Sequence, residues 1–417
     1  MSSPSRLSNT RIFYGWYVVA AAFAVTFVGF GCAYSFSTFA TPLQQDFGAS
    51  RGSVSLIFSM AGFLYFGLGS LSGPLADRWG SRRLALLGML LTGLGLIAAS
   101  VARSLFEVYA AYGLGVGLGV GFAYVPAIGA VQRWFIRRRG FASGLAVSGI
   151  GVGTLAVPPL ASFLIEVFGW REAYLLLGVV AATIGGGMAL LIVNDPGDRG
   201  LGPDGGKLCR GAKPDGGGVP VRLAIQTREF IGLYAACLIC SFGVFVPFVH
   251  LIPYATGHGI PQSAAVLLLG AIGAGSTVGR FFLGSLADWI GRRLALPAMF
   301  TGMAAALFIW MFSSGFWSLA AFALAFGIFY GGWVALLPAV VMDDFGGANV
   351  SGIIGILYTS VAFGTLIGPS AAGFAFDISH SYTIPILASA CASAVAAGVV
   401  AMTSKTPESK AVTFLLG

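Results

Sequence analysis

The sequence predicts an all-α integral membrane protein in which twelve transmembrane helices form two six-helix bundles. Three observations carry this prediction: the composition, the recurrence of long apolar segments, and a motif that occurs twice. The chain of 417 residues is 57% hydrophobic and only 9% charged, whereas soluble domains carry about 25% charged residues. This composition excludes a soluble globular protein.

Apolar segments long enough to cross the ~30 Å hydrocarbon core of a bilayer as helices recur along the whole chain. The first follows Arg6 and Arg11 and resembles a signal peptide. It has no small-residue cleavage site, so we interpret it as an uncleaved first helix. The twelve expected spans are residues 14–41, 53–76, 84–102, 106–132, 141–165, 171–194, 228–256, 262–287, 294–312, 317–342, 350–376 and 382–403.

The basic residues predict the orientation of these spans, because cytoplasmic loops accumulate Lys and Arg. With a cytoplasmic N-terminus, only Arg51, Arg103 and Arg171 of the 23 Lys and Arg residues lie outside, and Arg280 lies within a span. We therefore expect a multi-pass protein of the cell (inner) membrane with both termini cytoplasmic. The net charge of +8 is this topology signal and requires no nucleic-acid partner.

The chain divides near its middle at residues 195–227, which are rich in Gly, Pro and charge and contain no apolar span. Such a segment predicts a flexible cytoplasmic linker between two units. The expected parts are a cytoplasmic N-terminus (1–11), an N-terminal six-helix bundle (12–194), the linker (195–227), a C-terminal six-helix bundle (228–404) and a cytoplasmic tail (405–417).

A motif occurs after the second span of each half: "GPLADRWGSRR" at 73–83 and "GSLADWIGRR" at 284–293. Internal duplication of a six-helix unit is typical of secondary transporters, which bind substrate near the bilayer midplane between the repeats. Acidic and basic residues at these helix ends can latch neighbouring helices in one conformation and release them in another. The expected gating residues are Gly73, Asp77, Arg78, Gly80, Asp288, Gly291 and Arg292.

Both copies resemble the signature of the major facilitator superfamily, and the resemblance covers the whole chain. Segments such as "FYGWYVV" near the N-terminus, "FVPFVHLIPYA" at 245–255 and "GPSAAGFAFDISHSY" at 368–382 further resemble the monocarboxylate transporter family and its prokaryotic relatives. The oxalate/formate-type anion exchangers are close neighbours. This resemblance implies movement of small organic acids such as lactate or pyruvate, commonly together with a proton.

The presence of Arg280 inside a span requires an explanation, because a charge at the centre of a span costs about 2.5–3.5 kcal/mol on insertion scales. It lies eight residues before Asp288, or ~12 Å from that helix end at 1.5 Å per residue. All fifteen Asp and Glu residues fall in loops or near helix ends, so none lies in the interior of a span. A cation without a fixed counter-ion is suited to a mobile anion, and its planar fork binds a carboxylate bidentately. The alternative is an arginine that bonds helix-end carbonyls or snorkels to the surface.

Nearby, the sequence departs from the family pattern. Animal members usually carry an aspartate one turn before this arginine and a lysine in the first helix, where this chain has Ser276 and Thr38. The sequence therefore does not identify the group that carries the proton. His250, in the seventh span, is a candidate proton site or outer anion contact because imidazole titrates near neutrality. A structural histidine is the equal alternative, and in that case the proton would travel on the substrate or on water.

The other walls of the site are predicted by depth in the membrane. Tyr124, Tyr330 and Tyr358 fall near the level of Arg280 and could donate hydrogen bonds to a carboxylate or hydroxyl, or could only pack against neighbouring helices. Leu145 could form an apolar wall, because the fifth helix faces the eighth in this superfamily.

No hydrolase triad, nucleotide loop, metal or cofactor motif is present in the sequence, so an enzyme is not expected. The expected partners are a small monocarboxylate, a proton and the lipid bilayer. Two other functions stay open: an exchanger of formate, oxalate or another dicarboxylate, and a transport-inactive sensor on the same fold. A dicarboxylate favours a second cation in the cavity, and only Arg280 is found there, which favours one carboxylate.

Overall fold

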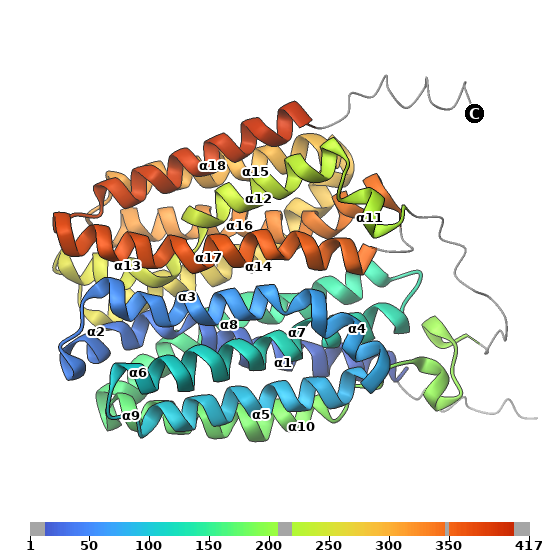
Figure 1. Ribbon diagram of the computed structural model, residues 1–417, viewed down its shortest axis with the longest axis horizontal. Coiled ribbons are helices and arrows are strands. Elements are labelled where there is room, and N and C mark those ends of the chain that lie inside the picture. The colour runs from blue at the N-terminus through green and yellow to red at the C-terminus, as the bar shows by residue number, and fades with distance from the viewer. Residues whose placement is uncertain (1–12, 207–218, 347–349, 404–417) are drawn as a thin grey trace, which may run out of the picture.

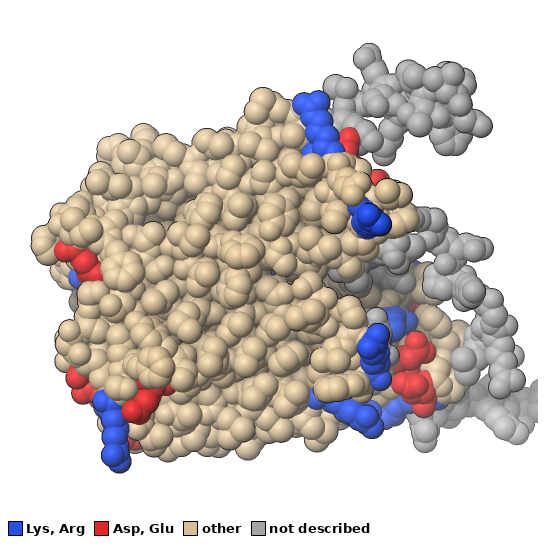
Figure 2. Space-filling model, viewed as in Figure 1, with Lys and Arg blue, Asp and Glu red and all other residues tan. Residues whose placement is uncertain are grey.

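The computed structural model describes residues 13–206, 219–346 and 350–403, apart from a few side chains inside the helices. Within this part, eleven helical segments are long and apolar enough to cross a membrane, and the bent pair Arg51–Gly67 and Gly69–Ala76 provides a twelfth. The predicted fold class and the twelve spans are thus confirmed. Figure 2 shows charged side chains at two opposite ends of one face, with an uncharged belt between them.

The helices form two layers that follow the chain order (Figure 1). The first layer contains α1 (Gly15–Tyr34), α2 (Phe36–Phe47), α3 (Arg51–Gly67), α4 (Gly69–Trp79), α5 (Ser81–Ser100), α6 (Leu105–Val108), η1 (Tyr109–Leu114), α7 (Gly115–Trp134), α8 (Arg139–Phe168), α9 (Trp170–Val180), η2 (Ala181–Gly185) and α10 (Gly186–Ala189). The second contains α12 (Arg228–Val244), α13 (Val246–Gly257), α14 (Gln262–Ile290), α15 (Arg292–Met311), α16 (Phe316–Phe345), α17 (Val350–Ser379) and α18 (Thr383–Thr403).

The first span of each half is broken at an equivalent place. Span one breaks at Ser35, between α1 and α2, and span seven breaks at Phe245, between α12 and α13. The second break lies two residues before Pro247, whose ring disfavours continuation of the preceding helix. Each half therefore has a short helical segment at one end of its first span.

The duplicated motif also adopts the same backbone turn twice. Gly80 joins α4 to α5 with φ 86° and ψ 138°, and Gly291 joins α14 to α15 with φ 87° and ψ 129°. Positive φ is accessible to glycine without steric cost because it has no Cβ. The turn glycines of the motif thus have a structural reason, and the repeat extends to conformation.

The two layers meet most closely where α8 packs on α14 and α3 packs on α17. A Cβ added to Gly273 would lie 2.6 Å from the carbonyl oxygen of Gly151, so only glycine permits this approach of α14 to α8. Because these contacts join residues from opposite halves, they define the interface at which the halves can move.

We call the end of the molecule that carries Arg51, Arg103 and Arg171 the distal end, and the opposite one the termini end. The described parts of the linker lie at the termini end. The Asp204 carboxylate accepts hydrogen bonds from the backbone N–H groups of Ile136 and Arg137, and residues 207–218 lie outside the described part. The linker was expected to be flexible, and its described stretches make defined contacts.

The distal end is closed by polar contacts between the halves. The Asp377 carboxylate of α17 accepts hydrogen bonds from the backbone N–H groups of Arg51 (3.0 Å) and Gly52 (2.8 Å), at the start of α3. The Arg51 guanidinium lies 3.9 Å from the centre of the Phe376 ring and donates to the Tyr382 hydroxyl at 2.8 Å. Burial raises the pKa of Tyr382, so its hydroxyl remains protonated. We call these contacts the distal latch.

Candidate functional site

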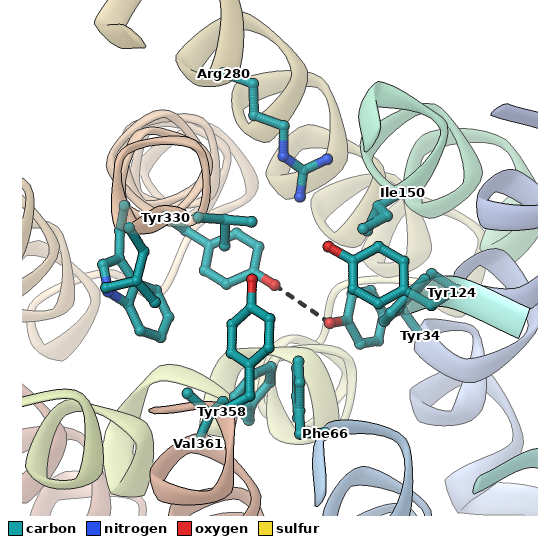
Figure 3. A pocket seen from close by; sticks show the side chains of 13 residues that line it. Tyr34, Phe66, Tyr124, Ile150, Arg280, Tyr330, Tyr358 and Val361 are labelled. Carbon is teal, nitrogen blue, oxygen red and sulfur yellow. Dashed lines mark hydrogen bonds between the residues drawn. The ribbon is translucent and has the colours of Figure 1, made fainter. Parts of the chain in front are cut away.

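A cavity lies between the two layers, with Arg280 at one side (Figure 3). Both halves contribute to its wall, and aromatic rings dominate it. A mostly apolar wall with few polar groups is the usual make-up of a small-molecule site. The lining residues are Phe30, Tyr34, Phe66, Tyr124, Ile150, Phe245, Arg280, Tyr330, Trp333, Val334, Leu337, Tyr358 and Val361.

Arg280 is only 6% exposed, and most of its donors are unused. Its Nη1 donates to the carbonyl oxygen of Val147 in α8 at 3.0 Å. Its Nε and Nη2 have no hydrogen-bond partner among the described residues. A buried donor without an acceptor costs about 1–3 kcal/mol, and more when it is charged. The unused edge of the guanidinium therefore requires an acceptor that the described protein does not supply.

Four tyrosine hydroxyls point toward the space beside the guanidinium (Figure 3). They belong to Tyr34 and Tyr124 of one half and to Tyr330 and Tyr358 of the other. The Tyr34 and Tyr330 hydroxyls are 3.2 Å apart, within hydrogen-bond distance. The site thus combines one cation with several neutral O–H donors, a set that suits an oxygen-rich anion.

The three tyrosines singled out from the sequence, Tyr124, Tyr330 and Tyr358, all line this cavity. Sequence reasoning missed Tyr34. It lies one helical turn after Phe30, which also lines the cavity, and this i, i+4 aromatic pair was the available signal.

The apolar wall from α8 is formed by a different residue from the one expected. Ile150 lines the cavity, whereas Leu145 is half-buried, packs against the core and is not among the lining residues. Val147, between them, contributes its carbonyl oxygen to Arg280. Helix α8 does face α14 as expected. Leu145 and Ile150 are five residues apart, which is more than one helical turn, so their side chains point in different directions around α8.

His250 lies away from the cavity, in a buried cluster at the distal end. Its Nε2 is 2.8 Å from the carbonyl oxygen of Pro369 and 3.4 Å from the Ser55 hydroxyl, and its Nδ1 is 3.2 Å from the Tyr382 hydroxyl. Because a carbonyl oxygen can only accept, Nε2 carries the hydrogen, and a neutral ring leaves Nδ1 to accept from Tyr382. His250 therefore belongs to the same interface as the distal latch.

The gating motifs lie at the termini end, where α4 meets α5 and α14 meets α15. Arg78 is exposed and Gly73 is partly buried. The side chains of Asp77, Asp288 and Arg292 lie outside the described residues, so their gating role stays a prediction. Among the residues described, no group of three or more His, Cys, Asp or Glu is placed to hold a metal ion.

Comparisons with known proteins agree with this architecture. The family model described as Major Facilitator Superfamily matches residues 21–346 and 231–415. The chain is 31% identical to monocarboxylate transporter 11 of Mus musculus over 395 residues, which cover 92% of this chain and 86% of that protein. It is 32% identical to monocarboxylate transporter 3 of Rattus norvegicus over 382 residues, which cover 89% and 76%, respectively.

A solved structure shares the fold. It is a bacterial homologue of the human lysosomal transporter Spinster, in an inward-facing and unoccupied conformation. The TM-score is 0.74 at 16% identity, with 94% of this chain and 97% of that chain covered.

Proposed function

Because the chain belongs to the major facilitator superfamily and is a transporter of the monocarboxylate type rather than an enzyme, we propose that it carries small monocarboxylates such as lactate or pyruvate. Transport proceeds by alternating access to the cavity beside Arg280, with one proton moved per anion. The protein spans the cell membrane many times, with both termini in the cytoplasm.

The unused edge of Arg280 is the observation that carries this proposal. Its Nε and Nη2 are buried, charged and without a partner among the described residues. A carboxylate accepts two parallel hydrogen bonds from such a fork. The nearby tyrosine hydroxyls then supply further donors for the remaining lone pairs of the anion.

The charge of the lining favours a monocarboxylate over a dicarboxylate. Arg280 is the one charged residue among the thirteen that line the cavity, so one carboxylate balances it. A dicarboxylate would leave a second negative charge in an apolar site, which is costly unless it is paired. Exchange of oxalate- or formate-type anions is the second candidate, and it is supported by the same arginine.

Proton coupling follows from the membrane potential. An anion that crossed alone against 100 mV would require ~2.3 kcal/mol per charge, which opposes import into an inside-negative cell. We expect electroneutral symport that is faster at acidic external pH. An inward negative current during lactate uptake would instead favour exchange or uniport.

The central experiment replaces Arg280 in proteoliposomes and measures counterflow of labelled lactate. Arg280→Lys keeps the charge but loses the planar fork, and Arg280→Gln loses the charge. Both are expected to reduce uptake at least 10-fold, since hydrogen bonds to charged groups contribute about 1.5–3 kcal/mol. Arg103→Lys, at an exposed position of the distal end, is the matched control and should transport normally.

Near-normal lactate counterflow by either Arg280 variant would refute the carboxylate-anchor role. A wild-type protein that catalyses no counterflow of any monocarboxylate would favour the transport-inactive sensor. Competition by formate, oxalate, lactate and pyruvate, with and without a proton gradient, separates symport from anion exchange.

A further inference from the structure

We propose that the Tyr34–Tyr330 hydroxyl pair is a second contact for the transported anion, and that bound anion replaces the direct hydrogen bond between the two halves. In the structure the halves are joined there by one direct hydrogen bond. In the loaded cavity they are joined through the anion, which accepts one bond from each half. This inference rests on the proposed binding of a carboxylate at Arg280.

The pair is placed for this role by its position between the halves. Tyr34 is the last residue of α1, and Tyr330 lies within α16, 296 residues later in the chain. Their hydroxyls are 3.2 Å apart, both side chains are at least 97% buried, and both line the Arg280 cavity. This hydrogen bond therefore crosses the interface at the level of the site.

Aromatic packing holds both rings in place. The Phe248 ring packs against both, with its centre 4.7 Å from that of Tyr34 and 5.2 Å from that of Tyr330. The Phe30 ring also packs against Tyr34, with 5.5 Å between the ring centres. Because the rings are fixed, the hydroxyls are preorganised, and little side-chain entropy is lost when they bond a ligand.

The hydrogens of the pair are not fully used. Each hydroxyl has one hydrogen, and a bond between the two uses only one of them. The buried Tyr65 hydroxyl interacts with that of Tyr34 but forms no hydrogen bond by standard geometry among the described residues. An anion oxygen beside Arg280 can accept both hydrogens, so that two charge-assisted bonds replace one neutral bond. Charge-assisted bonds are about twice as strong as neutral ones, which favours the exchange.

Replacement of the Tyr34–Tyr330 hydrogen bond by an anion would also affect a segment that helps to close the distal end. Tyr34 directly precedes the break at Ser35, after which α2 continues to the distal end. On α2, the Ser37 hydroxyl donates to the carbonyl oxygen of Val249 in the other half at 2.9 Å. An anion bound to the Tyr34 hydroxyl would thus contact the residue next to Ser35, where α2, a segment that helps to close the distal end, begins.

The test is equilibrium binding of lactate to the purified full-length protein, with Tyr34→Phe, Tyr330→Phe and the double variant. Phenylalanine keeps the ring and removes only the hydroxyl. If the ligand must break the pair in order to bind, each single variant loses one ligand bond but no longer has to break the pair. The double variant loses both ligand bonds. It also avoids the cost of breaking the pair, but that cost is avoided once, whereas the two single variants each avoid it.

We therefore expect the loss of affinity in the double variant to exceed the product of the two single losses. The excess equals the strength of one neutral hydrogen bond, about 2- to 10-fold in Kd. If the pair only stabilised the fold of the site, either single substitution would break it, and the double variant would lose no more than one of them. That result, or unchanged lactate affinity in all three variants, would overturn the inference.

Tyr174→Phe is the matched control. Tyr174 is fully buried in the same half as Tyr34, its hydroxyl has no partner among the described residues, and it does not line the cavity. Lactate binding by this variant should match the wild type. Loss of lactate binding in Arg280→Gln, with normal binding in the tyrosine variants, would overturn this inference alone. No lactate or pyruvate binding by the wild type would overturn the proposed function with it.

Discussion

Asp377→Asn should weaken the distal latch and expose the interface between the halves at that end. In the wild type, one carboxylate accepts two backbone hydrogen bonds, from Arg51 and Gly52. Both N–H groups are at the start of α3, where a helix favours negative charge. Asparagine keeps one acceptor oxygen, but it removes the charge and turns an NH2 group toward a donor.

The magnitude follows from the loss of one charge-assisted hydrogen bond, about 1.5–3 kcal/mol. Asp377 is partly buried rather than fully buried, so solvent screens the interaction and the lower limit of that range applies. About 1.5 kcal/mol corresponds to a roughly tenfold larger population of the distally open state. The effect acts on a conformational equilibrium, because the latch joins opposite halves.

Thiol labelling measures this population. Ser55 is 3% exposed and lies one turn after Arg51 on α3, where its hydroxyl is close to His250. Ser55→Cys, in a chain whose five native cysteines are replaced, should react slowly with a membrane-impermeant maleimide added from the distal side. We expect Asp377→Asn to raise that rate about tenfold, provided that opening is fast relative to labelling.

Asp46→Asn provides the matched control at the same end. Asp46 pairs with Arg171 at 2.6 Å, but both residues belong to the first half. Its loss should leave the labelling rate unchanged, because this ion pair lies within one half. An equal rate increase in both variants, or none in Asp377→Asn, would refute the assignment of Asp377 to a latch between the halves.

Two further predictions concern coupling and gating. If His250 holds the transported proton, His250→Ala should flatten the pH dependence of uptake more than it weakens lactate binding, because His250 lies outside the cavity and among the contacts of the distal interface. An unaltered pH profile would leave the substrate or water as the proton carrier. Asp77→Asn and Asp288→Asn should lower the turnover rate while lactate Kd stays the same, since both motifs lie at the termini end; a collapse of binding in either variant would contradict a gating role.

Features that depend on the local sequence could be predicted without the structure. The twelve spans follow from the length and polarity of continuous segments. Their ends agree with the helices to within a few residues, except for the first span, where α2 continues to Phe47, and the sixth, where α10 already ends at Ala189. Gly80 and Gly291 stand at turns with positive φ because the motif places glycine where a helix must end sharply. Arg280 could also be found in this way, because a lone charge inside an apolar segment is costly wherever that segment packs.

Features that depend on which distant segments meet could not be predicted. The partner of Arg280 is a backbone carbonyl of Val147, 133 residues away, and a carbonyl leaves no mark in the sequence. The packing of α8 on α14 put Ile150 rather than Leu145 on the cavity wall. Asp377 reads in the sequence as an ordinary charge at a helix end, and its part in closing the distal end appears only once α17 meets the start of α3. Apolarity and helix length are properties of a segment, whereas hydrogen bonds between the halves are properties of a relative placement that only the tertiary structure determines.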